Sequence, residues 1–193
     1  MINRVKKMLP SPTLKILYYS FIQPHLQYGL TAWGGCSNHN KKRVIAIQKR
    51  SIRTICKAYF TSHTEPRMKK VGILKLDDLY RQQCLVNVHS CVHEVAPGPI
   101  RNLIQLERNV SRFNLRSNEQ NPLNIVAPIT KSRIGSQSFS AKGAAFWNTL
   151  PTELQSVERK SVFKNTVKRT MLNEYQAVSE CHNPRCTDRR HHH

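Results

Sequence analysis

Two adjacent carboxylates, Asp77 and Asp78, are the first residues in this sequence whose chemistry has to be considered. A metal-dependent polymerase or nuclease needs clustered carboxylates to hold its ions. These two come where a helical pattern begins, and acidic residues there complement the positive end of a helix. The sequence offers no second acidic cluster to complete a two-metal site. We therefore interpret Asp77 and Asp78 as charges at a helix start and predict no catalytic residues.

The C-terminal sequence "CHNPRCTDRRHHH" contains a candidate zinc site. Cys181, His182 and Cys186, with one histidine of the terminal run, would supply the thiolate and imidazole ligands of tetrahedral zinc. The spacing between the cysteines is wide, and few residues separate Cys186 from the histidine run. We favour a disordered tail after Ser179, with an appended or chance histidine run, over a zinc site.

A second candidate pair consists of His89 and His93, which lie one helical turn apart with Cys91 between them. The spacing could place two imidazoles on one metal ion, but the pattern supplies no third ligand. We interpret both as partly buried structural residues. The sequence thus predicts no bound metal, no cofactor and no small-molecule substrate.

A row of cations accompanies the sequence "IAIQKRSIRTICK", residues 45–57. The pattern predicts a helix over residues 41–59 whose side chains separate into two faces. One face is mostly apolar and consists of Val44, Ile45, Gln48, Ile52, Ile55 and Cys56. The other is basic and consists of Lys42, Lys49, Arg50, Arg53 and Lys57. Because like charges at i,i+4 spacing destabilise a helix, this helix must dock its apolar face on a core.

Charge is distributed unevenly along the chain. Lys and Arg number 31 against 11 Asp and Glu, which gives the 193 residues a formal net charge of +20. Residues 1–60 contain eleven basic residues and no acid. Self-repulsion opposes compact folding unless a polyanion neutralises it, so nucleic acid is the first partner to consider. A solvated basic face is the alternative, although solvated helices ordinarily mix both signs.

The sequence "SPTLKILYYSFIQPHLQYGLTAWGG" predicts an N-terminal helix. Ser11 suits the N-cap, Pro24 should kink the helix because proline lacks the backbone donor, and the glycines at 34–35 should end it. Most of the aromatic residues share the apolar stripe, so we expect them to pack in the core rather than to stack on bases: Tyr18, Tyr19, Phe21, Tyr28 and Trp33.

The rest of the chain is also largely helical in pattern. Helices are predicted over residues 76–94, from a cap at Ser140 to about Asn148, and over residues 160–175. Residues 105–138 are expected to form a long loop or a few short strands. No segment has the length of apolar sequence that a membrane-spanning helix needs, and no signal sequence follows Met1. We therefore expect an intracellular protein, nuclear or cytoplasmic, without a membrane partner.

Ordered blocks of sequence resemble the C-terminal part of reverse transcriptases from non-LTR retrotransposons of the jockey and CR1 type. The blocks are "LYYSFIQPHLQYGLTAWG", "IQKRSIRTICK", "HTEP", "GILKLDDL", "FWNTLPTEL" and "SVFKNTVKR", and together they cover roughly residues 5–175. The resemblance implies a helical thumb-like segment with a C-terminal extension, which contacts the template RNA and the growing duplex. It also implies phosphate contacts for Lys49, Arg50 and Arg53 of the block "IQKRSIRTICK". We predict that the whole basic face contacts phosphates, that is Lys42, Lys49, Arg50, Arg53 and Lys57.

The sequence departs from this family in two places. "RFNLR" at residues 112–116 keeps Asn114 and Arg116 of a family motif but lacks its His and Thr. The aromatic-x-Asp-Asp motif of the catalytic palm is missing, and "LDDL" does not replace it. The chain therefore resembles a fragment without palm or endonuclease, and polymerisation is not implied.

We predict a mainly α fold, with a helical thumb-like unit followed by a smaller, mixed and loop-rich C-terminal part. The expected segments are residues 1–60 as a basic helical pair, 61–104 as its helical continuation, 105–178 as an extension ending in a helix, and 179–193 as the tail. The expected function is binding of RNA or an RNA/DNA duplex through phosphates, without catalysis. The alternative is a protein-interaction module whose basic face docks an acidic partner.

Overall fold

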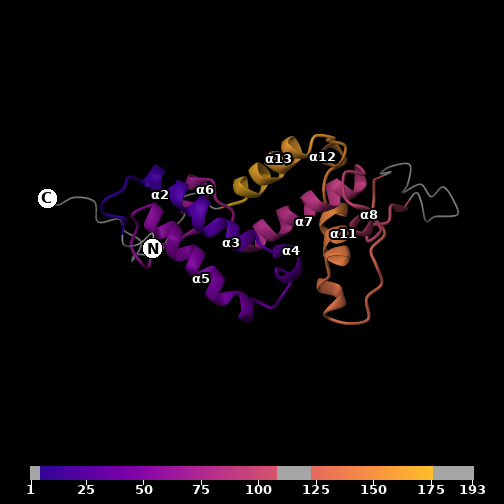
Figure 1. Ribbon diagram of the computed structural model, residues 1–193, viewed down its shortest axis with the longest axis horizontal. Helices are drawn as coiled ribbons and strands as arrows, with labels where there is room; N and C mark the ends of the chain where they lie inside the picture. Colours follow the sequence, from indigo (N-terminus) through magenta and orange to yellow (C-terminus); the bar gives the residue numbers. More distant parts are fainter. Residues whose placement is uncertain (1–4, 108–122, 176–193) are drawn as a thin grey trace. The chain divides into compact units, whose positions relative to one another are not determined.

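The computed structural model describes residues 5–107 and 123–175 (Figure 1). Helices dominate these residues, which confirms the mainly α prediction. Within the described ranges no strand forms, and Leu106 pairs with Ile125 in an isolated antiparallel bridge. The predicted tail, the candidate zinc ligands Cys181, His182 and Cys186, and the motif at residues 112–116 lie outside the described residues.

The chain divides into two compact units, each built from separate stretches of sequence. Of the described residues, the first unit comprises 5–28, 37–79 and 169–175. The second comprises Gly29–Cys36 and Tyr80–Lys168. The acid-free sequence before Glu65 falls mainly in the first unit, which therefore holds the candidate interface.

The N-terminal helical run is interrupted later than predicted. It consists of α2 (Ser11–Leu17), a π-helix (Tyr18–Ile22) and α3 (Gln23–Gln27), followed by the short α4 (Leu30–Trp33). Proline has no N–H, and the chain accommodates it with a wide turn in which the Gln23 N–H donates to Tyr18 O. The run therefore passes Pro24 and breaks at Gly29, whose φ of 58° is left-handed.

This wide turn changes which aromatic side chains are buried. Tyr18 is buried, as expected, but Phe21 is 50% exposed and Tyr28 is 86% exposed. A π-turn holds one residue more than an α-turn, so Phe21 within it and Tyr28 after it are rotated away from the stripe that a regular helix would continue. The expectation that Phe21 and Tyr28 pack in the core is therefore wrong.

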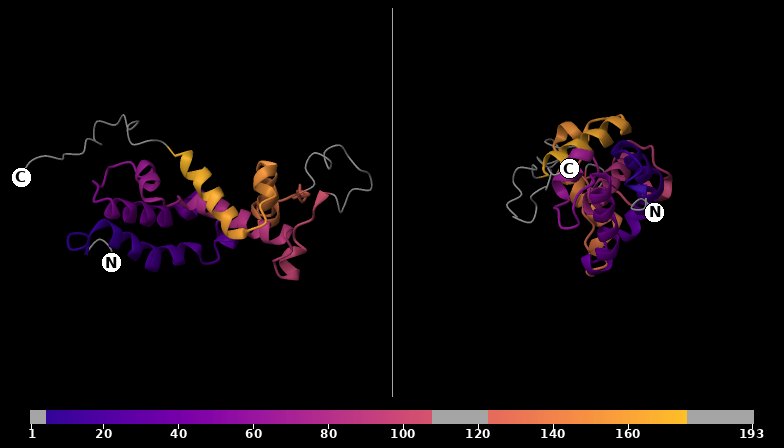
Figure 2. Two further views of the ribbon diagram at one scale, coloured as in Figure 1. Left: turned by 90° about the horizontal axis from the view of Figure 1, so that it is seen from above. Right: turned by 90° about the vertical axis from the view of Figure 1, so that its left-hand side faces the viewer.

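Helix α5 (Asn38–Ile55) runs back alongside α2 in the opposite direction (Figures 1 and 2). Gln48 is buried on α5, where its Nε2 donates to the Tyr18 hydroxyl of the π-helix at 3.2 Å and to Leu74 O at 2.9 Å. Ile52 and Ile55 are buried beside it. The predicted apolar face thus docks on a core, although the helix begins three residues earlier and ends four residues earlier than expected.

Two further helices complete the described core of the first unit together with the start of α7 (Leu76–Val92). They are α6 (Glu65–Val71), for which no separate helix was predicted, and the end of α13 (Lys160–Asn173). Asp77 pairs with Lys41 at 2.5 Å, and Asp78 accepts a hydrogen bond from the Tyr175 hydroxyl at 2.5 Å. The two carboxylates thus lie in the first turn of α7, as predicted, and hold neighbouring segments.

The second unit packs α11 (Phe139–Asn148) and the first part of α13 against the main part of α7. Its core includes Trp147, Phe163 and His89, all buried. Gly143 allows close packing, because a Cβ there would lie 2.8 Å from the Val88 Cγ2 atom. Ser138, rather than the predicted Ser140, caps α11 through a hydrogen bond from the Ala141 N–H. Short helices fill the connections: α8 (Gly98–Arg101), a 3-10 turn (Gly135–Gln137) and α12 (Thr152–Gln155).

Candidate nucleic-acid interface

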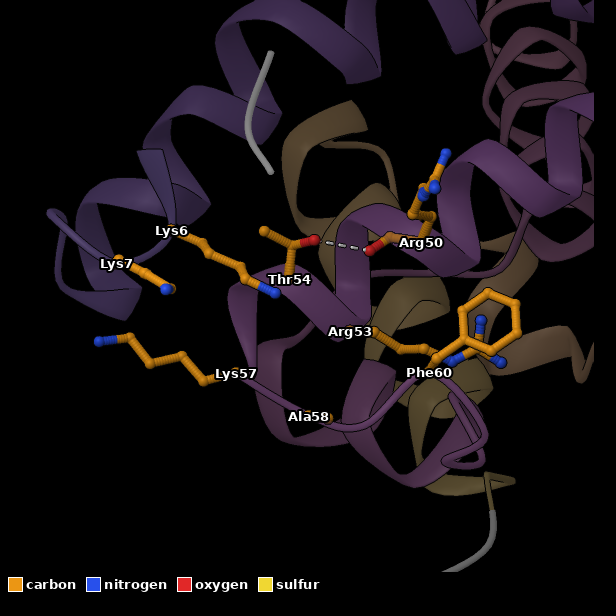
Figure 3. Close-up of a pocket in the computed structure, with 8 residues that line it drawn as sticks. All are labelled: Lys6, Lys7, Arg50, Arg53, Thr54, Lys57, Ala58 and Phe60. Atoms are coloured by element: carbon orange, nitrogen blue, oxygen red, sulfur yellow. Dashed lines mark hydrogen bonds between the residues drawn. The ribbon is translucent and has the colours of Figure 1, made fainter. Parts of the chain in front are cut away.

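Basic side chains surround a hollow at the C-terminal end of α5, within the first unit (Figure 3). Its volume is about 530 Å³, which is in the range of small-ligand sites. We call it the basic hollow, and its lining residues are Lys6, Lys7, Arg50, Arg53, Thr54, Lys57, Ala58 and Phe60. Five of these residues are cationic and none is acidic, so the hollow suits an anion.

The cations of the basic hollow come from two segments that are far apart in sequence. Lys6 and Lys7 lie in a turn before α2, where the Met8 and Leu9 N–H groups donate to Val5 O. The others lie on α5 or in the loop that follows it. The negative end of the helix dipole attracts cations, which accounts for basic residues at the end of α5. It does not account for two lysines that reach the same hollow from another segment.

Lys57 occupies an unusual backbone conformation at the edge of the hollow. Its φ is 49°, in the left-handed region that glycine or asparagine usually fills. The Lys57 N–H donates to Thr54 O at 3.1 Å, and the Ala58 N–H donates to Arg53 O at 2.8 Å. These bonds form a Schellman motif, which ends α5 and places Lys57 outside the helix, contrary to the prediction. The side chain is still exposed and lines the hollow.

Arg53 is more engaged than a solvent-facing residue would be. Its Nε donates to Ser62 O at 3.0 Å, and its guanidinium carbon lies 5.7 Å from the ring centroid of Phe60. Burial, and after it the positive charge of Arg67, lowers the pKa of Arg53. An anion in the hollow would relieve this repulsion between like charges.

The cations of the basic hollow are not neutralised by acids in the described part of the chain. There, the ion pairs join Lys41 with Asp77, Lys75 with Glu65 and Asp78, and Arg101 with Glu94. None of these pairs includes a residue that lines the hollow. Since the first acid in the sequence is Glu65, the local excess of positive charge follows from the sequence itself.

The structure gathers only some of the residues that the sequence analysis assigned to phosphate contact. Arg50, Arg53 and Lys57 line the basic hollow. Lys42 and Lys49 are exposed on α5 but do not line it. Three further residues line the hollow that were not predicted from the sequence: Lys6, Lys7 and Phe60. The adjacent lysines Lys6 and Lys7, in a segment without acids, could have been recognised as candidate phosphate ligands. Nothing in their spacing predicts that their turn lies beside the end of α5.

The other candidate residues are held in structural contacts. The Nε2 atom of His89 donates to Val157 O at 2.5 Å, and its ring stacks on Phe163 with centroids 4.5 Å apart. The His93 ring lies 4.3 Å from the His89 ring, so both are packed as predicted. Among the described residues, no three His, Cys, Asp or Glu side chains lie close enough together to hold a metal ion.

None of the helices in the described ranges is both long and apolar enough to cross a membrane. No protein-family model, curated protein or solved structure matches this chain.

Proposed function

We propose that this chain binds nucleic acid through the phosphate backbone, with the basic hollow and the exposed basic face of α5 as the contact surface. One observation carries the proposal: five cations from two separate segments line one hollow, and no acid in the described residues pairs with them. Lys and Arg side chains in such an arrangement bind phosphates and release the counterions around them.

The rigidity of the surface supports this function. The Gln48 hydrogen bonds fasten α5 to the core from its buried face, and the Schellman motif fixes its end. Cations held on an ordered frame lose less conformational entropy on binding than cations on a mobile segment. Lys42 and Lys49 extend the row along the same helix, so a strand leaving the hollow could follow the exposed face of α5.

The sequence resemblance favours the same partner. The end of α5 and the two residues after it form the block "IQKRSIRTICK", which is similar to a basic helix of non-LTR reverse transcriptases. The proposal is therefore that the chain acts as the thumb-like, C-terminal part of such a polymerase and binds RNA or an RNA/DNA duplex. In this proposal the chain contributes binding and no polymerisation step. Contacts of Asp77 with Lys41 and of Asp78 with Tyr175 support a structural role for the two adjacent carboxylates.

Salt-titrated binding to an RNA/DNA duplex tests this function. If four or five cations each neutralise a phosphate, the slope of log affinity against log salt is about −4, taking the coefficient of B-form DNA. The double variant Arg50→Ala/Lys57→Ala should reduce that slope by about two. The matched control is Lys131→Ala/Lys164→Ala, which removes two exposed cations that do not line the hollow.

Two results would contradict the proposal. One is that both double variants change the slope equally, because the binding would then reflect net charge rather than this surface. The other is that polyglutamate displaces the duplex as well as unlabelled duplex does. That result would favour an acidic protein partner instead.

A further inference from the structure

Phe60 is the aromatic residue among those that line the basic hollow, and its side chain is 78% exposed. Phe60 takes no part in the phosphate contacts proposed above. Isolated exposed apolar residues are common on protein surfaces, so the exposure of Phe60 alone does not indicate a binding role. The position of Phe60 among five cations does indicate such a role, because nucleotides combine phosphates with flat aromatic bases.

The loop that carries Phe60 is fastened to α5 by Arg53 at both of its ends. Arg53 O accepts a hydrogen bond from the Ala58 N–H at 2.8 Å, and Arg53 Nε donates to Ser62 O at 3.0 Å. Ser62 is buried, and its N–H donates to Tyr59 O at 3.1 Å. The Phe60 ring is therefore presented on a short, hydrogen-bonded loop.

The two faces of the Phe60 ring differ in their surroundings. The Arg53 guanidinium lies over the ring, with its carbon 5.7 Å from the centroid, in a cation–π contact (Figure 3). The large exposed fraction of the side chain leaves room for a second flat group on the ring. Aromatic platforms beside cations are how proteins bind single strands, with bases stacked on rings and phosphates held by basic side chains.

We propose that the basic hollow takes an unpaired nucleotide, whose base stacks on Phe60 while neighbouring phosphates lie along Lys6, Lys7 and Lys57. This inference rests on the proposed function and adds that the basic hollow itself takes a single-stranded segment of the bound nucleic acid. Bases within a duplex are already stacked on their neighbours, so Phe60 cannot insert a contact there without unstacking them. Stacking requires only a π face, so the base sequence should matter little.

The test compares three labelled probes by fluorescence anisotropy: short oligothymidylate, the same strand with abasic sites, and a duplex of equal length. Phe60→Ala should weaken oligothymidylate binding roughly tenfold, since stacking on an aromatic residue contributes about that much or more. It should leave the abasic strand, the duplex and the salt slope unchanged. Oligouridylate should depend on Phe60 in the same way, because stacking involves the base and not the sugar.

Three further variants sharpen the assignment. Phe60→Trp should restore tight binding, whereas Phe60→Leu, which is apolar without a π system, should behave like Phe60→Ala. Tyr59→Ala removes an adjacent aromatic ring that is 55% exposed but does not line the hollow, and it should have little effect. Each substituted side chain is largely exposed, so all variants should fold.

The outcomes separate this inference from the proposed function. Equal binding of oligothymidylate and the abasic strand, or equal effects of Phe60→Ala on all three probes, would overturn the role of Phe60 while the salt slope still reported phosphate contacts. An effect of Tyr59→Ala as large as that of Phe60→Ala would also overturn it. Loss of the salt dependence itself would instead reject the proposed function.

Discussion

The backbone of Lys57 places a charged residue where glycine would be more stable. A left-handed residue with a Cβ is strained, and a helix C-terminus of this kind usually ends in glycine. Glu94 has the same role after α7, with a φ of 58°, a hydrogen bond from its N–H to Cys91 O and one from the Val95 N–H to Ser90 O. Strained residues concentrate at functional sites, and only Lys57 of these two lines the basic hollow.

We predict that Lys57→Gly stabilises the protein by about 0.5–1 kcal/mol and at the same time weakens nucleic-acid binding. The strain at φ 49° disappears, and so does one cation of the hollow. Thermal unfolding and salt-titrated binding measure the two effects on the same sample. Glu94→Gly is the matched control, which should stabilise similarly and leave binding intact. If Lys57→Gly binds nucleic acid as tightly as the parent protein does, Lys57 is not part of the interface.

His89 gives the protein a pH dependence that is separate from binding. Burial lowers the pKa of its imidazole and outweighs the hydrogen bond to Val157 O, which raises it. The unfolded state therefore binds the proton more tightly, and stability is lost as the pH falls below the ordinary histidine pKa of about 6.5. We predict that His89→Gln, which keeps a donor for Val157 O but does not titrate, flattens this part of a stability profile measured by denaturant unfolding. Parallel profiles for both proteins would assign the pH dependence to other groups.

At the scale of single residues, the sequence predicted chemical type better than position. The basic face of α5 and the helix-start carboxylates follow from periodicity and charge. The Schellman motif at the end of α5 could not be predicted, because its left-handed position holds Lys57 instead of the glycine that usually marks such a motif. The contribution of Lys6 and Lys7 to the basic hollow could not be predicted either. It depends on tertiary packing between segments that lie more than 40 residues apart in the sequence.

At the scale of elements, long amphipathic patterns were the most dependable guide. Helices α5, α7 and α13 lie within a few residues of the predicted ranges. The N-terminal run was harder, because a proline within a helical pattern can produce a kink, an end or a wide turn, and here it follows a π-helix. The short α6 was missed because seven residues with Pro66 give too little periodic signal.

The packing of α11 on α7 depends on the absence of a side chain at Gly143. A Cβ there would lie 2.8 Å from the Val88 Cγ2 atom, closer than packed atoms approach. We predict that Gly143→Ala destabilises the protein by about 1–3 kcal/mol, the usual cost of overpacking a core. Urea unfolding measures the change, and Gly98→Ala, where a Cβ would meet no atom within 4 Å, is the control.

A double-variant cycle shows whether that cost comes from this contact. Val88→Ala removes the methyl groups that a new Cβ at position 143 would meet, so the combination Val88→Ala/Gly143→Ala should cost less than the sum of the two single changes. Strict additivity would mean that the two helices do not meet as described.

At the scale of the whole molecule, a net charge of +20 destabilises the compact state through repulsion between like charges. The interactions that offset it in the described residues are apolar cores, the hydrogen bonds of Gln48 and a few ion pairs away from the basic hollow. A polyanion bound to the folded state adds stability by mass action. Charge composition thus favours the class of partner that we propose, while only the fold shows where the charges converge.

The most direct measurement of the central claim is lysine acetylation of the full chain with and without a bound nucleic acid, read by mass spectrometry at each lysine. Lys6, Lys7 and Lys57 should be protected by the nucleic acid, because their ammonium groups would then contact phosphates. Lys131 and Lys164, which are exposed and do not line the basic hollow, should react equally in both samples. Protection spread evenly over all five lysines, or confined to Lys131 and Lys164, would contradict a nucleic-acid interface at the basic hollow.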